Sequence, residues 1–421
     1  MEDEPCWFVG VDWASKTHHV RILDAKGRTL GERSFAHGGE GLAGLAAWVL
    51  SLTKTGPEAV HVAIEMPHGP VVESLMERGF HLYAINPKQL DRFRDRYSPA
   101  GAKDDSRDAR VLADALRTDR HCFRALQPID PILIELREWS RLAEELGGQR
   151  TRLGNRVREL LWRYYPQLLE VTDDAAAPWF LALWRLIPTP EKAARIQQGT
   201  VERLLKGYRI RRLTAAQVLH TVRAPAIPVA AGTAKAASDH LALIAKQLDL
   251  VNRQISEAGQ RIDRLTQQFA GATDDAEGHC KEQRDVTILR SLPGLGRIIL
   301  ATLLAEAPEA LRRRDYHALR CLCGAAPITK RSGKSKSVLM RRAVHTRLRN
   351  ALHHWARTAV QHDPRSKAKY AALRGRGHGH SRALRSVGDR LLAVACAMLK
   401  AQTVFNRNLP FQGEIIAQIP A

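Results

Sequence analysis

The chain has 421 residues, 44% of them hydrophobic, which is enough for two or three domains with packed cores and excludes a disordered chain. Its 65 basic residues against 44 acidic ones give a net charge of +21. Residues 311–390 alone hold 21 basic and 3 acidic residues, a charge of +18, so we expect a polyanionic partner, nucleic acid above all.

The first residues, MEDEPCWFVG, are acidic and show no secretory signal, and no uncharged apolar run is long enough to span a bilayer. The basic residues are spread through loops and short helices, without the single amphipathic helix that would anchor a protein on an anionic membrane. The 6 cysteines lack paired CxxC spacing, which argues against a disulfide framework or a zinc ribbon. We therefore expect a cytoplasmic protein with no membrane partner.

The first part of the chain alternates between strand and helix patterns. Strand patterns occupy residues 7–11, 18–23, 29–35, 59–64 and 81–85, and helical periodicity occupies residues 41–52 and 71–78. The turn Asp24-Ala-Lys-Gly27 joins the second and third strands into a hairpin. Three strands, a helix, and then alternating strand and helix predict a mixed α/β sheet of the ribonuclease H or RuvC type.

After Asp130-Pro131 the pattern becomes almost entirely helical, so we expect α domains to follow the α/β domain. Two stretches show heptad spacing: Trp139, Leu146, Leu153 and Leu160 in the first, and Ile244, Leu248, Val251, Ile255, Ala258, Ile262, Leu265 and Phe269 in the second. Such a seam suits a helical hairpin within one chain or a coiled coil between chains. We favour a coiled coil that also joins protomers.

These patterns divide the chain into six segments. They are a RuvC-like domain at 1–128, a coiled-coil helix at 129–170, a helical linker region at 171–235, a second coiled-coil helix and loop at 236–285, a mostly helical serine-containing domain at 286–405, and a C-terminal tail at 406–421. The boundaries fall where the periodicity changes or where polar and glycine residues gather.

Four carboxylates stand where strands and a helix would bring them together. Asp12 follows the strand 7–11 and Glu65 follows the strand 59–64, so both project from strand ends. Asp105 and Asp108 are three residues apart, which turns both toward one face of a helix that begins near Ser106. Such carboxylates repel one another unless a cation neutralises them, and hard oxygen ligands suit Mg²⁺ or Mn²⁺. We therefore predict that these four acids bind metal and are catalytic.

The run DDSRD also has a simpler interpretation. Asp104 or Asp105 would cap the helix, while Lys103, Arg107 and Arg110 pair with surface acids. Asp12 and Glu65 favour the metal site, because acids after a first and a fourth strand are what two-metal phosphoryl transfer on this sheet requires.

In the basic region, the segment Leu-Pro-Gly-Leu-Gly at 292–296 lies between two predicted helices. Its glycines would let backbone amides approach a phosphate closely, so we predict that Gly294 and Gly296 contact the DNA backbone as in a helix-hairpin-helix. The alternative is an ordinary turn whose glycines allow tight helix packing.

Ser332 lies in a segment that we interpret as a polar loop between two helices. A hydroxyl there could attack a phosphate held by neighbouring cations, although Ser335 and Ser337 stand nearby and most loop serines cap helices or face water. No Ser, His and Asp ordering suggests a hydrolase triad, so metals or cations would have to activate the hydroxyl. The predicted phosphate-binding cations are Lys330, Arg331, Lys334, Lys336, Arg341 and Arg342.

These motifs resemble the DEDD-type insertion-sequence transposases of the IS110 family. The front of the chain matches in GVDWASKTHHV, AIEMPHG, INPKQLDRFR and KDDSRDARVLADAL. The helix motif Lys-x-Asp-x-x-Asp-Ala selects Lys103, Asp105, Asp108 and Ala109. The back matches in LPGLG, LLAE, the Gly-x-x-Pro pattern at 324–327 and RSGK, whose serine is Ser332.

The resemblance implies a RuvC-like domain and a transposase domain that cleave and exchange DNA strands. It implies carboxylate-bound Mg²⁺ and a covalent phosphoserine on Ser332, in active sites that two protomers of a dimer or tetramer build together. It also implies a structured noncoding guide RNA, a bridge RNA that pairs with donor and target DNA, and a nucleoid-associated prokaryotic protein. Lys103 joins the predicted nucleic-acid-binding residues through this match.

We therefore predict a recombinase of an insertion sequence. The sequence contains no GxxxxGK[ST] loop, which agrees with strand exchange through a phosphoserine that conserves the energy of the broken bond and needs no ATP. One alternative is a metal-dependent junction nuclease that uses the acids alone. The other is a nonenzymatic nucleic-acid-binding protein, which the basic window alone would satisfy.

Overall fold

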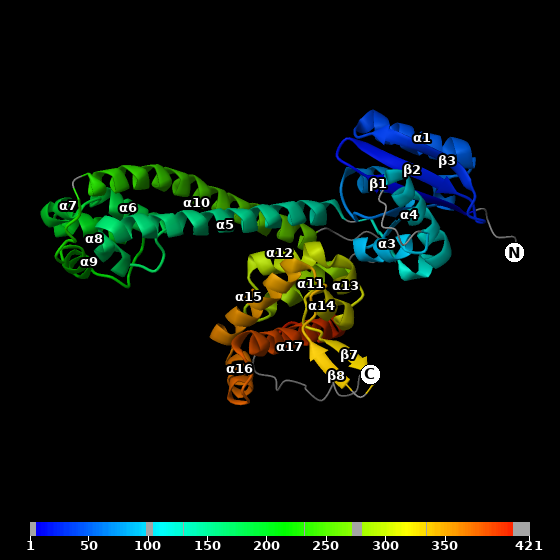
Figure 1. Ribbon diagram of the computed structural model, residues 1–421. Coiled ribbons are helices and arrows are strands. Elements are labelled where there is room, and N and C mark those ends of the chain that lie inside the picture. Colours follow the sequence, from blue (N-terminus) through cyan, green and yellow to red (C-terminus); the bar gives the residue numbers. More distant parts are fainter. Residues whose placement is uncertain are drawn as a thin grey trace. The chain divides into compact units, whose positions relative to one another are not determined.

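The computed structural model describes residues 6–97, 104–128, 130–230, 232–271, 280–333 and 335–406. The chain forms two compact units, Met1–Ile129 and Asp130–Ala421 (Figure 1). Two of the predicted nucleic-acid contacts, Lys103 and Lys334, lie outside the described residues.

The first unit is built on a mixed sheet. Its strands are β1 (Trp7–Trp13), β2 (Thr17–Leu23), β3 (Thr29–Ala36), β4 (Val60–Ile64), β5 (His81–Ala84) and β6 (Arg124–Ala125), in the order β3-β2-β1-β4-β5-β6. The β1–β2, β2–β3 and β5–β6 pairs are antiparallel, whereas β4 pairs in parallel with both β1 and β5. The mixed α/β sheet and its first hairpin are confirmed. β6 was not predicted, because two residues show no periodicity.

Helices cover both faces of this sheet. α1 (Gly39–Thr53) and α2 (Pro70–Met76) pack on one face, together with Val9 and Val11 of β1. α3 (Pro87–Arg94) and α4 (Asp105–Asp119) pack on the other face, together with Phe8 of β1 and Ala63 of β4. Because side chains alternate along a strand, the even-numbered residues of β1 face α4.

α4 approaches the sheet most closely at Gly10. A Cβ atom added there would lie 1.9 Å from the carbonyl oxygen of Ala109 and 2.7 Å from the backbone nitrogen of Ala113. Only a residue without a side chain allows the backbones of β1 and α4 to come this close. This contact therefore sets the position of the helix that carries Asp105 and Asp108.

We expect the substitution Gly10→Ala to push α4 away from the sheet, because the new methyl group would meet backbone atoms that cannot rotate aside. The free energy of unfolding should fall by roughly 1–3 kcal/mol, as for other overpacked sites. Chemical denaturation measures this loss. Gly44 is the control, since it lies exposed in α1 with no atom within 4 Å of an added Cβ. Gly44→Ala should leave stability unchanged or raise it slightly; equal losses in both variants would contradict the packing argument.

The second unit is almost entirely helical. Two long helices, α5 (Pro131–Tyr164) and α10 (Thr233–Gly271), pack along each other, with smaller helices at one end (Figure 1). These smaller helices are α6 (Pro178–Leu186), α7 (Pro190–Arg195), α8 (Gln198–Gly207) and α9 (Ala215–Val222). They share one apolar core with the adjoining parts of α5 and α10.

The heptad seam of α10 lies inside this single chain. Seven of its eight predicted positions are buried and Ile255 is partly buried. The partner of the seam is α5, in which Leu146 and Leu160 are buried. A helical hairpin within one chain therefore accounts for the seam, and a coiled coil that joins protomers stays a prediction.

The remaining helices of the second unit are α11 (Cys280–Ser291), α12 (Arg297–Glu306), α13 (Pro308–Arg312), α14 (Tyr316–Leu322), α15 (Thr346–His362), α16 (Pro364–Gly375) and α17 (His380–Ala401). A two-stranded hairpin of β7 (Ile328–Ser332) and β8 (Ser335–Leu339) separates α14 from α15. Among the residues described above, no helix is long and apolar enough to cross a membrane.

Candidate functional site

Asp12 and Glu65 lie side by side at the ends of two parallel strands. The last register pair of β1 and β4 is Val11 with Ile64, so Asp12 and Glu65 are the next residue on each strand. Phe8 and Ala63 point toward α4, so the alternation along β1 places Asp12 on that face, and Glu65 directly follows β4. β1 continues to Trp13, so Asp12 lies inside the strand and not just after it, as predicted. Both acids are partly buried.

α4 runs antiparallel to β1, with its first turn toward Asp12. At its other end, Arg117 donates to the carbonyl oxygen of Ala25, 3.3 Å away, in the turn that follows β2. This turn lies beside the start of β1, because Leu23 pairs with Phe8. The helix crosses β1 at Gly10, so Asp105 and Asp108 lie toward the strand end that carries Asp12. The fold thus directs all four predicted acids to one edge of the sheet.

The three aspartates that begin α4 have different surroundings. Asp104 is the N-cap, and its side chain accepts a hydrogen bond from the backbone nitrogen of Ser106 at 3.4 Å. Asp105 is exposed in the first turn, and Asp108 is buried. The capping interpretation thus holds for Asp104 and leaves the other two carboxylates for another role. The partial positive charge of the helix N-terminus favours acids at both positions.

Asp108 is held by an arginine that the sequence analysis did not single out. Arg94, at the end of α3, places Nε 2.5 Å from Oδ1 and Nη2 2.8 Å from Oδ2 of Asp108. The hydrogen bond to Asp108 raises the pKa of the Arg94 guanidinium despite its partial burial. Arg94 lies in the motif INPKQLDRFR, but no local spacing pairs it with a residue 14 positions later. A metal ion at Asp108 would have to share this carboxylate with Arg94 or displace the arginine.

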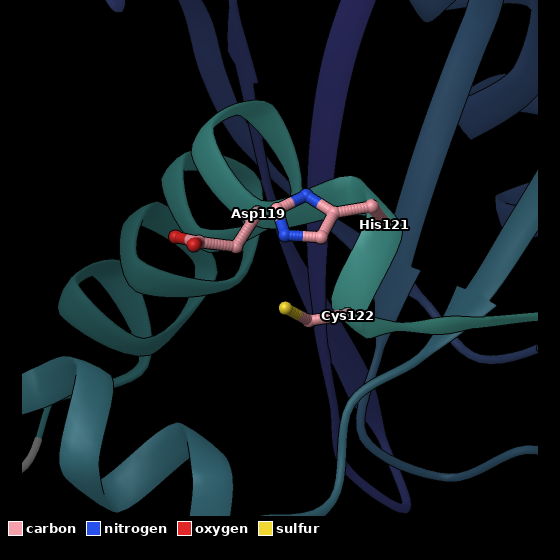
Figure 2. A group of neighbouring side chains, drawn as sticks. All are labelled: Asp119, His121 and Cys122. Atoms are coloured by element: carbon pink, nitrogen blue, oxygen red, sulfur yellow. The ribbon is translucent and has the colours of Figure 1, made fainter.

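The oxygens of the four acids are not drawn together in this conformation. Within the described ranges, one group of three or more His, Cys, Asp and Glu side chains has donor atoms that all lie within 4.8 Å of one another: Asp119, His121 and Cys122 (Figure 2). The donor set of the predicted site still suits a hard divalent ion, because it consists of carboxylates alone.

The group in Figure 2 lies at the opposite end of α4, roughly 20 Å from Asp105 at 1.5 Å of rise per residue. Its residues come from the run Asp-Arg-His-Cys at 119–122, which the sequence analysis passed over. The Asp119 carboxylate already accepts a hydrogen bond from Thr118 at 2.6 Å and pairs with Arg96 at 3.5 Å. This group is therefore separate from the predicted acidic site.

Ser332 lies at the tip of a β-hairpin, so the predicted polar loop was wrong. Ser332 pairs with Ser335 across the ends of β7 and β8, and Gly333 in the connecting turn has a φ of +54°. A glycine accepts this left-handed conformation readily, which suits a two-residue hairpin turn. Every described residue from 329 to 339 is exposed, and Ser332 is thus open to a large substrate.

The two faces of the hairpin carry different side chains. Residues directly opposite one another share a face, so Ser332 shares its face with Lys330, Ser335 and Ser337. Arg331 lies opposite Lys336 on the other face. Two like charges in this arrangement destabilise a hairpin unless an anion lies between them. The hairpin therefore presents three serine hydroxyls with one lysine on one face and a cationic pair on the other.

The two glycines of the 292–296 turn differ in their surroundings. A Cβ at Gly294, whose φ is +77°, would lie 2.6 Å from the backbone nitrogen of Ala359 in α15. The ring nitrogen of Trp355 donates to the carbonyl oxygen of Pro293 at 2.9 Å and holds the turn on the same helix. Helix packing thus explains Gly294. Gly296 is exposed, is the N-cap of α12, and has open space around it, so its predicted phosphate contact keeps a physical basis.

The acids belong to the first compact unit and Ser332 to the second. Their convergence on one phosphorus atom therefore stays a prediction, as do the roles of the six cations near Ser332. Arg341 is partly exposed, and Arg342 is exposed beyond the end of β8.

Two family models match the chain. A DEDD model of the IS110 type, described as a transposase, covers residues 9–166, and a model described as the transposase IS116/IS110/IS902 family covers residues 286–371. The first match contains all four predicted acids, and the second contains the Gly294 turn and Ser332.

Individual relatives agree with these matches. The provisionally named transposase y4uE of Sinorhizobium fredii is 59% identical over 216 residues, which are 51% of this chain and 60% of that protein. The provisionally named mini-circle transposase for IS117 of Streptomyces coelicolor is 31% identical over 424 residues, with 97% of this chain and 98% of the relative covered. The uncharacterized 44.8 kDa protein of insertion element IS116 of Streptomyces clavuligerus is 28% identical, with 96% and 97% covered.

Proposed function

The chain belongs to the IS116/IS110/IS902 family of transposases, and from this premise we propose that it cuts and rejoins DNA with a RuvC-like acidic site and a serine nucleophile. In this proposal residues 1–128 form the RuvC-like domain of the ribonuclease H type, and residues 286–405 form the serine domain. The observation that carries the acidic site is the antiparallel course of α4 over β1, which directs Asp105 and Asp108 toward Asp12 and Glu65.

The four carboxylates would hold Mg²⁺ or Mn²⁺, which would offset the negative charge that develops on phosphate oxygens during DNA cleavage. Asp12 and Glu65 contribute from a sheet whose register holds them in place, and Asp105 contributes from an exposed first turn. Arg94 holds the Asp108 carboxylate in one orientation through two hydrogen bonds in the absence of substrate. A site of this kind is open to a large polyanion because three of its acids are only partly buried or exposed.

Ser332 would attack the phosphorus atom of a DNA strand. An Oγ–P bond forms, the bond from phosphorus to one deoxyribose oxygen breaks, and the serine proton ends on the departing hydroxyl. Attack by a hydroxyl of a second strand then reverses these changes and joins the new strands. Lys330, on the same face as Ser332, would bind a nonbridging phosphate oxygen. The alternative nuclease uses the acids alone and leaves Ser332 as a bystander.

The proposal also includes an oligomer with active sites shared between protomers and a structured noncoding guide RNA, both implied by the family. The basic second unit offers phosphate contacts for either nucleic acid. Extraction of nucleic acid from the purified chain, followed by separate ribonuclease and deoxyribonuclease digestion, tests for the RNA. If the extract from cells that carry the whole element contained only DNA, this result would count against a guide RNA.

We expect Glu65→Gln to lower the rate of DNA cleavage by roughly 10²–10³-fold, because a carboxamide is a weaker ligand and removes one charge from the predicted metal site. DNA binding should stay within about twofold, since phosphate contacts do not need this carboxylate. Cleavage of labelled element-end DNA in Mg²⁺ buffer and DNA binding by fluorescence anisotropy measure the two effects. Glu73→Gln, at an exposed position of α2, is the matched control and should cleave normally. Unchanged cleavage by Glu65→Gln would remove the acidic site from the mechanism.

A further inference from the structure

A basic pocket lies at the base of the serine hairpin. It has a volume of about 470 Å³. Its walls come from Gly324–Pro327 before β7, from the end of β8 and Arg341 after it, and from Arg382 and Arg385 of α17. Neither Arg382 nor Arg385 was predicted to have a role, and both lie more than forty positions after Arg341 in the chain.

Arg341 has an unsatisfied donor in this pocket. Its Nε atom is buried and has no hydrogen-bond partner. A buried guanidinium nitrogen without a partner costs free energy, so such a group in a native protein usually awaits a ligand or an ordered water.

The other two arginines are not neutralised by acids. In the part of the chain that the structure describes, neither Arg382 nor Arg385 forms an ion pair, and Arg385 donates instead to the sulfur of Met340 at 2.9 Å. The one carboxylate in the wall, Asp389, is held by Arg320 at 2.8 Å and by the hydroxyl of Tyr316 at 2.9 Å. The pocket therefore keeps a strong positive potential.

α17 adds to this potential. It begins at His380 and has no acidic residue in its first turn, so Arg382 lies near the positive end of the helix dipole, and Arg385 follows in the next turn. Cations at this end are unfavourable unless an anion binds there. The helix dipole and the arginine side chains thus both make the potential in the pocket more positive.

We propose that Arg341, Arg382 and Arg385 bind a backbone phosphate of the DNA strand that reaches Ser332. The inference rests on the proposed function, because Ser332 lies at the tip of the hairpin whose base forms the pocket wall. Ser332 lies four residue steps from Ile328, which pairs with Leu339 at the base of the hairpin, a length of roughly 13 Å at 3.3 Å per residue. With about 3.4 Å of rise per nucleotide in a duplex strand, the bound phosphate lies about four nucleotides from the cleaved one.

The test compares two double variants on a fluorescein-labelled duplex from the end of the element that encodes the chain. Arg382→Ala with Arg385→Ala should weaken binding roughly tenfold at low salt and lower the slope of log Kd against log salt by about 2, one for each lost phosphate contact. The control is Arg357→Ala with Lys367→Ala, which removes two exposed cations of α15 and α16 outside the pocket. A loss of DNA affinity no larger than that of the control would overturn the proposal that the pocket binds a phosphate.

A methylphosphonate scan on the wild-type protein keeps the test independent of whether the double variant folds. Single neutral linkages placed along the strand should weaken binding most at roughly three to five nucleotides from the cleaved phosphate. A flat profile over this region overturns the proposal. The proposal is also overturned if the Arg382 and Arg385 double variant loses affinity for a labelled RNA probe but not for the duplex. Covalent adducts on the unmodified duplex are scored separately. The absence of adducts would refute the proposed serine chemistry. Adducts together with a flat scan would refute only the proposal that the pocket binds a backbone phosphate.

Discussion

Ser332→Ala should abolish covalent protein–DNA adducts and strand exchange, with a fall of at least about 10⁴-fold, because removal of a nucleophile leaves no atom to form the intermediate. The hairpin should keep its structure, since Ser332 is exposed and its backbone pairing with Ser335 does not depend on the side chain. Denaturing gel electrophoresis of the protein after incubation with labelled element-end DNA measures the adduct directly.

Ser335 supplies the matched control for this experiment. It lies opposite Ser332 on the same face of the hairpin and is equally exposed, so Ser335→Ala tests every property of the tip except the identity of the nucleophile. We expect Ser335→Ala to form adducts at a rate within a few-fold of the wild type. Adducts that persist in Ser332→Ala but vanish in Ser335→Ala would identify Ser335, and not Ser332, as the nucleophile. Cleavage that continues unchanged in both variants would favour the nuclease.

Glu306→Gln should destabilise the second unit by about 3 kcal/mol, because it leaves several partly buried cations without their shared counterion. The Glu306 side chain at the end of α12 is only 5% exposed. Its carboxylate binds Nε of Arg141 at 3.2 Å, Nε2 of His345 at 3.4 Å and the guanidinium of Arg347. Arg137 approaches to 3.9 Å. One acid therefore ties α5, α12 and the start of α15 together.

The pH dependence of unfolding should identify this carboxylate. Burial alone would raise the pKa of Glu306, but the hydrogen bond from His345 and the charges of Arg141 and Arg347 outweigh burial and lower it to about 2 from its usual 4.5. A depressed carboxyl pKa in the folded state stabilises the protein above the unfolded-state pKa. This contribution should be fully present above about pH 4.5 and should be lost as the pH falls toward 2.

Glu138 is the control for Glu306. It also pairs with Arg141, at 3.2 Å, but its side chain is 64% exposed. Glu138→Gln should cost less than about 1 kcal/mol, as for other surface ion pairs, and should keep the acid-dependent loss of stability. Urea denaturation of the two variants and the wild type at several pH values makes the comparison. If Glu306→Gln retained the wild-type loss of stability in acid, the carboxylate would not be the titrating group.

Five of the six strands of the first unit and the two long helices were predictable from local periodicity. In β1 the residues Val9 and Val11 alternate with residues of the opposite face, and in α10 the seam from Ile244 to Phe269 repeats by threes and fours. Both patterns exist because one side of each element is buried. The N-cap at Asp104 was one of the alternatives considered, since capping depends on residues two or three positions away.

The hairpin of Ser332 was not predicted, because it lacks the burial that produces such periodicity. Its strands bury neither face, so no alternation of apolar and polar residues marks them. Cross-strand pairing and the turn at Gly333 decide this structure, and a run of lysine, serine and arginine shows neither. The prediction of secondary structure therefore failed where burial supplied no signal.

The sequence by itself determined the kinds of chemistry available to this protein: four carboxylates near strand ends and one helix, a hydroxyl among cations, and a strongly basic second half. Tertiary structure alone decided which groups are neighbours. It placed Arg94 on Asp108, three arginines and a histidine around Glu306, and two arginines of α17 beside Arg341. These contacts join residues that local patterns cannot connect, because periodicity reports only which side of an element is buried, whereas charge pairing depends on which elements pack against one another.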